Sequence, residues 1–298
     1  MTRLKHYIEY LFVRFLYWLL GTFPEWMMRA VARFLAFIMR FVIHYRSTVI
    51  DVNLELAFPE KSKAERKQIK NKFYYHIALF FLEFIRGPKV TDQYLEERII
   101  IEDDTALKKY IGKPVLLVSG HIGEFNLWLM LMVKYLGTHL NVIFKDQRNP
   151  YTSQMNVDFR YACGQKPIFS KGAIKKCIEL LEAKEYIGFL NDQNPWDRGI
   201  NVNFFGHEAP TMKGLAIFKE QFDYPILQGY VVRDEQKGMY RFWINELEIE
   251  KSDDQETYYK NILQASNDHL EAAVKRFPDQ YLWSHRRWRI EYHELEKL

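Results

Sequence analysis

The sequence has only two cysteines among 298 residues, Cys163 and Cys177. So few cysteines exclude a disulfide-held scaffold and a cysteine-rich zinc or iron–sulfur site. A glycine-rich phosphate loop, an H-E-x-x-H metal motif and a G-x-S-x-G nucleophile elbow are also missing, and with them the usual signatures of nucleotide-binding proteins, zinc proteases and serine esterases. No repeat, low-complexity segment or long linker divides the chain. Its 48% hydrophobic residues are enough to bury a full core.

Positive charge is concentrated at the N-terminus. Residues 1–50 contain seven Lys or Arg and two acids, a net charge of +5, whereas the other 248 residues carry 35 bases and 36 acids, a net charge of −1. A nucleic-acid-binding protein normally has a basic face on its folded body. A neutral body with a basic, aromatic-rich N-terminus instead favours a membrane surface that contains anionic lipids.

Two apolar segments make up this N-terminus. The first, 7–20, contains two charges and is shorter than the roughly 20 apolar residues of a comfortable membrane span. The second, 27–45, places its arginines and one histidine on a narrow helical stripe, with apolar residues on the rest of the surface. We therefore predict that residues 1–46 are basic, apolar helices that anchor the protein at a bilayer surface. The alternatives are core helices of a soluble protein and a single true span.

The chain after residue 50 alternates between helical and strand-like patterns. Ser62, with Glu65 three residues later, is typical of a helix start. We expect helices over 61–86, 124–136, 172–183, 212–221 and 255–277. We expect strands over 115–119, 141–145, 186–190, 225–233 and 239–250, the last two forming a hairpin. Interleaved strands and helices predict an α/β fold with helices packed around a mostly parallel or mixed sheet.

The clearest candidate for chemistry is the turn Ser119-Gly120-His121-Ile122-Gly123, between a predicted strand and a predicted helix. Ligands of open α/β sheets bind beyond the carboxyl ends of strands, so His121 would be presented at a site. Glu124 or Asn126 is near enough in sequence to orient the ring and support an imidazolium. A helix-capping histidine without catalytic function is the alternative.

Two other polar loops follow predicted strands. Asp192 and Gln193 begin an Asn/Asp/Pro-rich segment that an ordinary turn would also explain. Arg148 and Arg160 belong to a basic stretch near the same predicted cleft, which suits phosphate binding, although scattered solvated charges are an equal explanation.

Several blocks in order resemble the lauroyl/myristoyl acyltransferases of lipid A biosynthesis, a branch of the glycerolipid-type acyltransferases. The resemblance covers nearly the whole chain and includes Glu83 on the predicted helix 61–86. Its motifs are Asn53-Leu54 with Phe58-Pro59-Glu60, Ser119-Gly120-His121 with Gly123, Asp192-Gln193 with Phe204-Phe205-Gly206, and Trp283-Ser284-His285-Arg286-Arg287-Trp288. One position departs from the family pattern, because the acid expected five residues after the histidine is Asn126. Either Glu124 takes the role of that acid, or the chain is a weak or non-catalytic relative.

The resemblance implies a glycerolipid-acyltransferase-like mixed sheet flanked by helices over residues 47–298. It implies transfer of a fatty acyl group from acyl carrier protein, or from coenzyme A, to a hydroxyl or amine of a lipid acceptor such as a lipid A precursor, at the cytoplasmic face of the inner membrane. His121 would be the base, supported by Glu124 or Asn126. No metal or cofactor is needed. The substrate-binding residues would be Arg148, Arg160, Asp192, Gln193, Phe205 and Gly206. A non-catalytic lipid-binding protein and a soluble esterase are the rival functions.

Overall fold

The computed structural model describes residues 2–145, 147–290 and 292. It is built around a seven-stranded sheet in the order β1-β9-β8-β2-β5-β3-β4. Neighbouring strands are parallel except β8 and β9, which form the predicted antiparallel hairpin. The strands are β1 (Ile99–Asp103), β2 (Leu116–Ser119), β3 (Leu140–Phe144), β4 (Gln165–Phe169), β5 (Ile187–Leu190), β8 (Ile226–Asp234) and β9 (Met239–Glu246).

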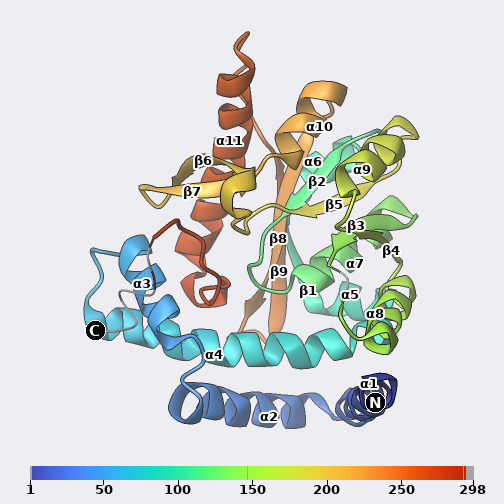
Figure 1. Cartoon of the computed structure of the whole chain (residues 1–298), viewed down its shortest axis with the longest axis vertical. Helices are drawn as coiled ribbons and strands as arrows, with labels where there is room; N and C mark the ends of the chain where they lie inside the picture. Colours follow the sequence, from blue (N-terminus) through green and yellow to red (C-terminus); the bar gives the residue numbers. More distant parts are fainter. Residues whose placement is uncertain (1, 146, 291, 293–298) are drawn as a thin grey trace.

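Helices cover both faces of this sheet (Figure 1). The helices on one face are α5 (Asp92–Arg98), α6 (Thr105–Lys109), α7 (Phe125–Leu136) and α8 (Pro150–Ala162). Those on the other face are α9 (Ala173–Glu182), α10 (Gly214–Phe222) and α11 (Gln255–Arg276). The predicted α/β class is therefore confirmed, and all nine residues of β8 are buried between the two layers, as a strand covered on both faces requires.

A second group of elements closes one end of the sheet. It contains α3 (Ser47–Ala57), α4 (Lys63–Ile85), the short 3-10 helices η2 (Gly87–Lys89), η3 (Trp196–Arg198) and η4 (Pro278–Gln280), and the hairpin of β6 (Gly199–Phe204) and β7 (His207–Met212). Ser62 and Glu65 form the predicted capping box at the start of α4. Sequence patterns did not reveal the β6–β7 hairpin.

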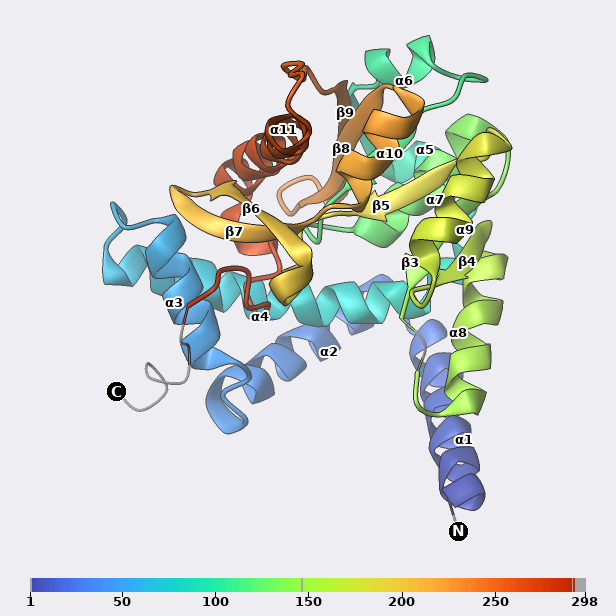
Figure 2. The same ribbon diagram turned by 45° about the horizontal axis from the view of Figure 1, so that its top comes forward.

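The N-terminal helices pack beneath α4 (Figures 1 and 2). They are α1 (Thr2–Gly21), α2 (Glu25–Phe37) and a π-helical turn η1 (Ile38–Val42). Met28 and Ala32 of α2 are fully buried against Ala78, Leu79 and Leu82 of α4. Among the residues described, no helix combines the length and apolar character needed to cross a bilayer.

Candidate functional site

The loop after β2 carries His121 and is held from both sides. Ser119 ends β2 and its hydroxyl donates to the Gly229 carbonyl of β8 at 2.8 Å. The His121 carbonyl accepts a hydrogen bond from the Leu282 amide at 3.0 Å, and the Gly123 amide donates to the Gln280 carbonyl at 3.0 Å. The backbone that presents His121 is thus fixed by β8 and by a segment near the C-terminus.

Gly123 is required by the path of this loop. Its φ is +58°, and a Cβ atom there would lie 2.2 Å from the Val231 carbonyl oxygen of β8. A side chain at Gly120 would likewise collide with Leu270, with a contact of 2.8 Å. Both glycines therefore let the loop pack closely against β8 and α11.

His121 is paired with Asp192, which follows β5. Because β2 and β5 are adjacent and parallel, the loops at their carboxyl ends meet. One Asp192 carboxylate oxygen lies 2.7 Å from Nδ1 of His121, and the other accepts the His121 backbone N–H at 3.0 Å. The neutral ring therefore carries its proton on Nδ1, since an ionised carboxylate can only accept, and its free lone pair is on Nε2.

The charge of Asp192 is stabilised although the group is buried, with 4% of its side chain exposed. Burial alone raises the pKa of Asp192, but the His121 ring, the His121 backbone N–H and the Arg287 guanidinium together lower it below its ordinary value. Arg287 is itself 1% exposed and donates to Thr211 Oγ1 at 2.7 Å. Asp192 is therefore ionised at neutral pH.

Gln193 occupies the other side of the imidazole. Its side-chain Nε2 lies 3.1 Å from Nε2 of His121, so the amide donates to the basic lone pair of the ring. The Asn194 backbone N–H donates to Nε2 of His285 at 2.8 Å. Burial lowers the pKa of His285 to about 4, which keeps that ring neutral and able to accept. The loop 191–194 is thus positioned by both His121 and His285.

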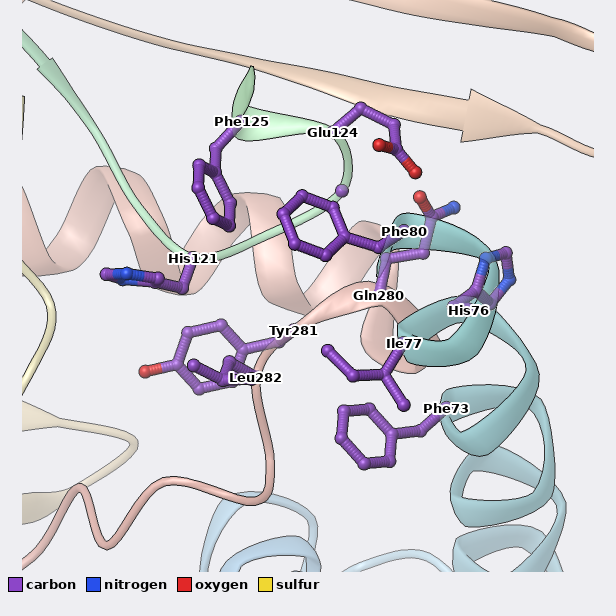
Figure 3. A pocket seen from close by; sticks show the side chains of 11 residues that line it. Phe73, His76, Ile77, Phe80, His121, Glu124, Phe125, Gln280, Tyr281 and Leu282 are labelled. Carbon is purple, nitrogen blue, oxygen red and sulfur yellow. The ribbon is translucent and has the colours of Figure 1, made fainter. Parts of the chain in front are cut away.

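A small open pocket lies beside His121 (Figure 3). Its walls come from one face of α4, from the loop after β2 and from residues 280–282. The lining residues are Phe73, His76, Ile77, Phe80, His121, Gly123, Glu124, Phe125, Gln280, Tyr281 and Leu282. With 16% of its side chain exposed, His121 is accessible from this pocket. Within the described ranges, no cluster of His, Cys, Asp and Glu is arranged to hold a metal ion.

Glu124 was predicted to orient His121, and the structure places its carboxylate elsewhere. Figure 3 shows the side chain directed away from the imidazole, on the side of Gln280. Glu124 accepts a hydrogen bond from Arg233 at 2.6 Å and is 5% exposed. Burial and the nearby Glu83 carboxylate raise the pKa of Glu124 to about 8, against the lowering effect of Arg233. The carboxylate beside the ring is that of Asp192, so this part of the prediction is wrong.

Asn126 is the other predicted orienting residue, and it too lies away from the ring. Its side-chain oxygen accepts from Gln165 at 3.4 Å, and Gln165 accepts from Arg160 at 3.0 Å. The first turn of α7 directs Asn126 into the core, where it is 4% exposed. Arg160 stacks over Phe144, and burial lowers its pKa. Arg160 is therefore joined to Asn126 through Gln165 and is not placed beside His121.

The remaining predicted binding residues lie outside this pocket. Arg148 is exposed in the loop between β3 and α8. Phe205 and Gly206 form the turn of the β6–β7 hairpin, with φ of 54° and 76°. Phe205 is 8% exposed and packs against Phe58 and Trp283. The Phe-Phe-Gly block thus forms the turn of a hairpin and packs in its core. Its position in the structure gives no support to the expectation that it contacts substrate.

The part of the site that sequence reasoning missed is the pairing of Asp192 with His121. Both residues were singled out as polar groups after predicted strands, but local patterns do not specify the order of those strands in the sheet. The contributions of Arg287 and His285 were missed too. The only signal for them was the C-terminal Trp-Ser-His-Arg-Arg-Trp block, where buried polar side chains in an aromatic segment require partners.

Comparisons with known proteins agree on one family. The family model of bacterial lipid A biosynthesis acyltransferases matches residues 1–290. A lipid A biosynthesis acyltransferase from Haemophilus influenzae is 21% identical over 239 residues, which cover 79% of this chain and 73% of that protein. The lipid A biosynthesis palmitoleoyltransferase of Escherichia coli is 23% identical over 250 residues, 82% of this chain and 79% of its own length. A Shigella flexneri acyltransferase matches to the same extent.

The match extends through every element that builds the site, from α1 to the C-terminal segment. A histidine at a pocket, paired with a buried carboxylate at the edge of an α/β sheet, fits acyl transfer in which a base activates the nucleophile. The chain belongs to the bacterial lipid A biosynthesis acyltransferases and is an acyltransferase.

Proposed function

We propose that this protein transfers a fatty acyl group from an acyl thioester to a hydroxyl or amine of a lipid acceptor, with His121 as the general base. The 2.7 Å contact between Asp192 and Nδ1 of His121 carries the proposal. It leaves the basic lone pair on Nε2, where the Gln193 amide lies at 3.1 Å, and it supplies a negative charge for the imidazolium formed during the reaction. Names of relatives favour a lipid A precursor as acceptor. Acyl carrier protein or coenzyme A would carry the acyl group.

The reaction follows from the geometry around the ring. The acceptor displaces the Gln193 amide from Nε2 and gives its proton to that nitrogen while its oxygen or nitrogen attacks the thioester carbonyl. Asp192 stabilises the resulting imidazolium. The tetrahedral intermediate then expels the thiolate, which takes the proton back from His121. The displaced Gln193 amide and the first amides of α7 are the nearest candidate donors to the oxyanion, a role in which a single donor contributes about 10²–10³ in rate.

The presence of Asn126 where the family pattern has an acid does not argue against catalysis in this arrangement. Asp192 provides the full negative charge that an amide could not provide. Asn126 interacts with Gln165 instead of the imidazole. The non-catalytic alternative rested on the missing carboxylate, and the pairing of His121 with Asp192 removes that reason.

His121→Ala tests the role of the base. Purified full-length protein should retain its fold, measured by circular dichroism and thermal unfolding, and lose acyl transfer from a long-chain acyl thioester to a lipid A precursor. His139→Ala is the matched control, because His139 is exposed in the turn between α7 and β3, does not line the pocket and should leave turnover unchanged. Turnover by the His121→Ala variant at the wild-type rate would exclude His121 as the base.

We also propose that residues 1–46 bring the enzyme to the cytoplasmic face of the inner membrane, with residues 47–298 as the acyltransferase domain. The lower surface in Figures 1 and 2 is formed by α1 and α2. Large apolar side chains are exposed along these helices and η1, namely Leu4, Tyr7, Ile8, Leu11, Phe12, Phe15, Trp18, Trp26, Phe34, Leu35, Phe37, Phe41 and Val42. So many exposed large apolar side chains on neighbouring helices typically mark a lipid or protein contact.

Two arginines on this surface support binding to anionic lipids. Arg33 and Arg40 line an open hollow with Phe37, Phe41, Tyr75 and the carboxylate of Glu235, so two guanidinium groups face one acid and leave an excess positive charge for phosphate. Arg33→Glu/Arg40→Glu should weaken sedimentation with vesicles of phosphatidylglycerol and phosphatidylethanolamine, while Lys175→Glu on exposed α9 should leave it unchanged. Equal sedimentation of the wild type, the Arg33→Glu/Arg40→Glu variant and the Lys175→Glu variant with these vesicles would refute the electrostatic part of the proposal.

A further inference from the structure

A second histidine–carboxylate pair lies in the wall of the His121 pocket. His76 of α4 lines this pocket together with His121, and Figure 3 shows the two rings on opposite sides of it. The Nε2 atom of His76 lies 3.0 Å from a carboxylate oxygen of Asp279 in η4. The pair therefore joins the middle of α4 to a turn near the C-terminus.

The His76 ring is not arranged to act as a second base. Its other nitrogen, Nδ1, lies 4.0 Å from a carboxylate oxygen of Glu235, in the turn between β8 and β9. Glu235 is also paired with Arg29 of α2 at 3.1 Å. Each ring nitrogen thus faces an acid of the protein, whereas a general base needs a lone pair that is open to the substrate. The pair therefore acts through the segment that Asp279 holds in place.

Asp279 directly precedes a segment that holds the loop carrying His121. The Gln280 carbonyl accepts a hydrogen bond from the Gly123 amide at 3.0 Å. The Leu282 amide donates to the His121 carbonyl, also at 3.0 Å. An antiparallel bridge lies between these two hydrogen bonds, so the segment pairs with the loop as a short strand does.

This segment, residues 280–282, is called the loop clamp below, and it is fixed at two points. On β8, the Gln280 side chain accepts from the Arg233 amide and donates to the Arg233 carbonyl, both at 2.8 Å. On α4, the fixed point is the contact of Asp279 with His76. Without the second point, the clamp would be free to pivot about Gln280.

The loop needs this external support because its own backbone is permissive. Gly120 and Gly123 flank the histidine, and glycine restricts the chain least. The Nδ1 atom of His121 has to stay beside Asp192, at 2.7 Å in the structure. A shift of about 1 Å would take this contact beyond hydrogen-bond distance. A misplacement of that size can cost about 10²-fold in rate.

We propose that His76 and Asp279 are positioning residues for His121, which act by holding the loop clamp against α4. This proposal rests on the role of base proposed above for His121. Loss of the pair should lower kcat by about tenfold to 10²-fold, because the imidazole then leaves its place beside Asp192 in most molecules. KM should change far less, because the other residues that line the pocket are unaltered.

Two pairs of substitutions test the contact itself. His76→Gln places an amide nitrogen where Nε2 was and keeps a donor for Asp279, whereas the shorter His76→Asn places its amide near the position of Nδ1. Asp279→Asn keeps an acceptor oxygen for Nε2, and Asp279→Ala has none. In acyl transfer by the full-length proteins, His76→Asn and Asp279→Ala should show the fall in kcat, and His76→Gln and Asp279→Asn should restore most of it.

Asp104→Ala is the matched control for lost stability. Asp104 is a buried carboxylate that accepts from the Tyr135 hydroxyl at 2.6 Å and pairs with Lys108 at 2.9 Å. It follows β1, which runs antiparallel to β2, so it lies at the opposite end of the sheet from His121. Asp104→Ala should lower the midpoint of thermal unfolding as Asp279→Ala does, but it should leave kcat unchanged.

A spectroscopic readout is independent of turnover. In protein labelled with isotopic histidine, the Nδ1 proton that His121 shares with Asp192 should give a downfield ring signal in NMR spectra, identified by its absence from His121→Ala. The signal should broaden or disappear in His76→Asn and return in His76→Gln. If the proteins show this pattern but the wild type transfers no acyl group, the proposed reaction is wrong and the positioning role is supported.

Three results would overturn the positioning role. The first is an unchanged kcat and ring signal in folded His76→Asn or Asp279→Ala, and the second is a failure of both conservative variants to restore kcat. The third is an effect of another kind. An equal fall in kcat in Asp104→Ala would assign the loss to stability, and a change confined to KM would assign His76 to substrate binding.

Discussion

Replacing Asp192 by asparagine is the sharpest test of the proposed base. The two carboxylate oxygens have different partners, the His121 backbone N–H and ring Nδ1. An asparagine has one acceptor oxygen, and if that oxygen keeps the backbone N–H, its amide donates to Nδ1. The ring proton then moves to Nε2, and the ring can no longer accept a proton from the substrate. The fold is preserved because the shape of the side chain is unchanged.

The magnitude can be worked from the distance. A carboxylate 2.7 Å from a protonated ring nitrogen stabilises it by about 6 kcal/mol at an effective dielectric constant near 20. The corresponding acid-to-amide change in serine proteases lowers kcat by about 10⁴, or about 5 kcal/mol. We therefore expect Asp192→Asn to lower kcat by about 10³–10⁴ with a much smaller effect on KM.

The assay measures kcat and KM for transfer from an acyl thioester to a lipid A precursor, with thermal unfolding as the check on folding. Asn126→Ala is the matched control, because Asn126 is a buried amide of the same chemical type that interacts with Gln165. It should lower turnover less than tenfold, an effect of under about 1.4 kcal/mol. Similar losses in both variants, or a loss confined to KM in Asp192→Asn, would refute the assignment of Asp192.

Three further predictions concern stability. Gly123→Ala should lower the free energy of unfolding by about 2–4 kcal/mol in urea titrations, because a side chain there meets the β8 backbone, whereas Gly206→Ala, at positive φ in open space, should cost only about 1 kcal/mol. Burial lowers the pKa of His269 to about 4 from 6.5, so the unfolded chain binds the proton first. His269 should then contribute a loss of up to about 3 kcal/mol as pH drops from 6.5 to 4, besides the loss from His285, whose pKa is lowered in the same way. His269→Gln should remove its share and make the profile shallower; an unchanged profile would contradict the assignment. Asn53→Ala removes three hydrogen bonds of 2.7 Å to residues 283–292, so calorimetry should show a free energy of unfolding lower by about 3 kcal/mol. A decrease of less than about 1 kcal/mol would contradict the stabilising role of these hydrogen bonds.

Local patterns predicted those parts of the fold that are locally determined. The capping residues Ser62 and Glu65 located the start of α4, and the alternation of apolar residues over 239–250 located β9, which pairs with β8 as predicted. Strand β4 was missed because it contains Lys166 and Pro167 within five residues, which conceals its pattern. Phe205 and Gly206 at the turn of the β6–β7 hairpin were predicted to bind substrate because of the family resemblance, and Phe-Phe-Gly carries no polar turn signal that would have revealed the hairpin.

The candidate site was predictable residue by residue but not as an arrangement. His121 and Asp192 were each located at the end of a strand, where ligand-binding residues of such sheets occur. Their pairing depends on β2 lying beside β5, and strand order is set by packing of the whole sheet. Sequence proximity therefore favoured Glu124 and Asn126, whose side chains the first turn of α7 directs elsewhere.

The hydrogen bonds from residues 280–282 to the loop that carries His121 have a consequence for biosynthesis. A ribosome releases the N-terminal helices of this chain long before it has translated the segment that fixes the histidine loop. On the membrane role proposed for residues 1–46, a nascent polypeptide can reach a lipid surface before the histidine loop has its C-terminal support. We therefore expect prematurely terminated products that lack residues 280–282 to bind that surface without modifying its lipids.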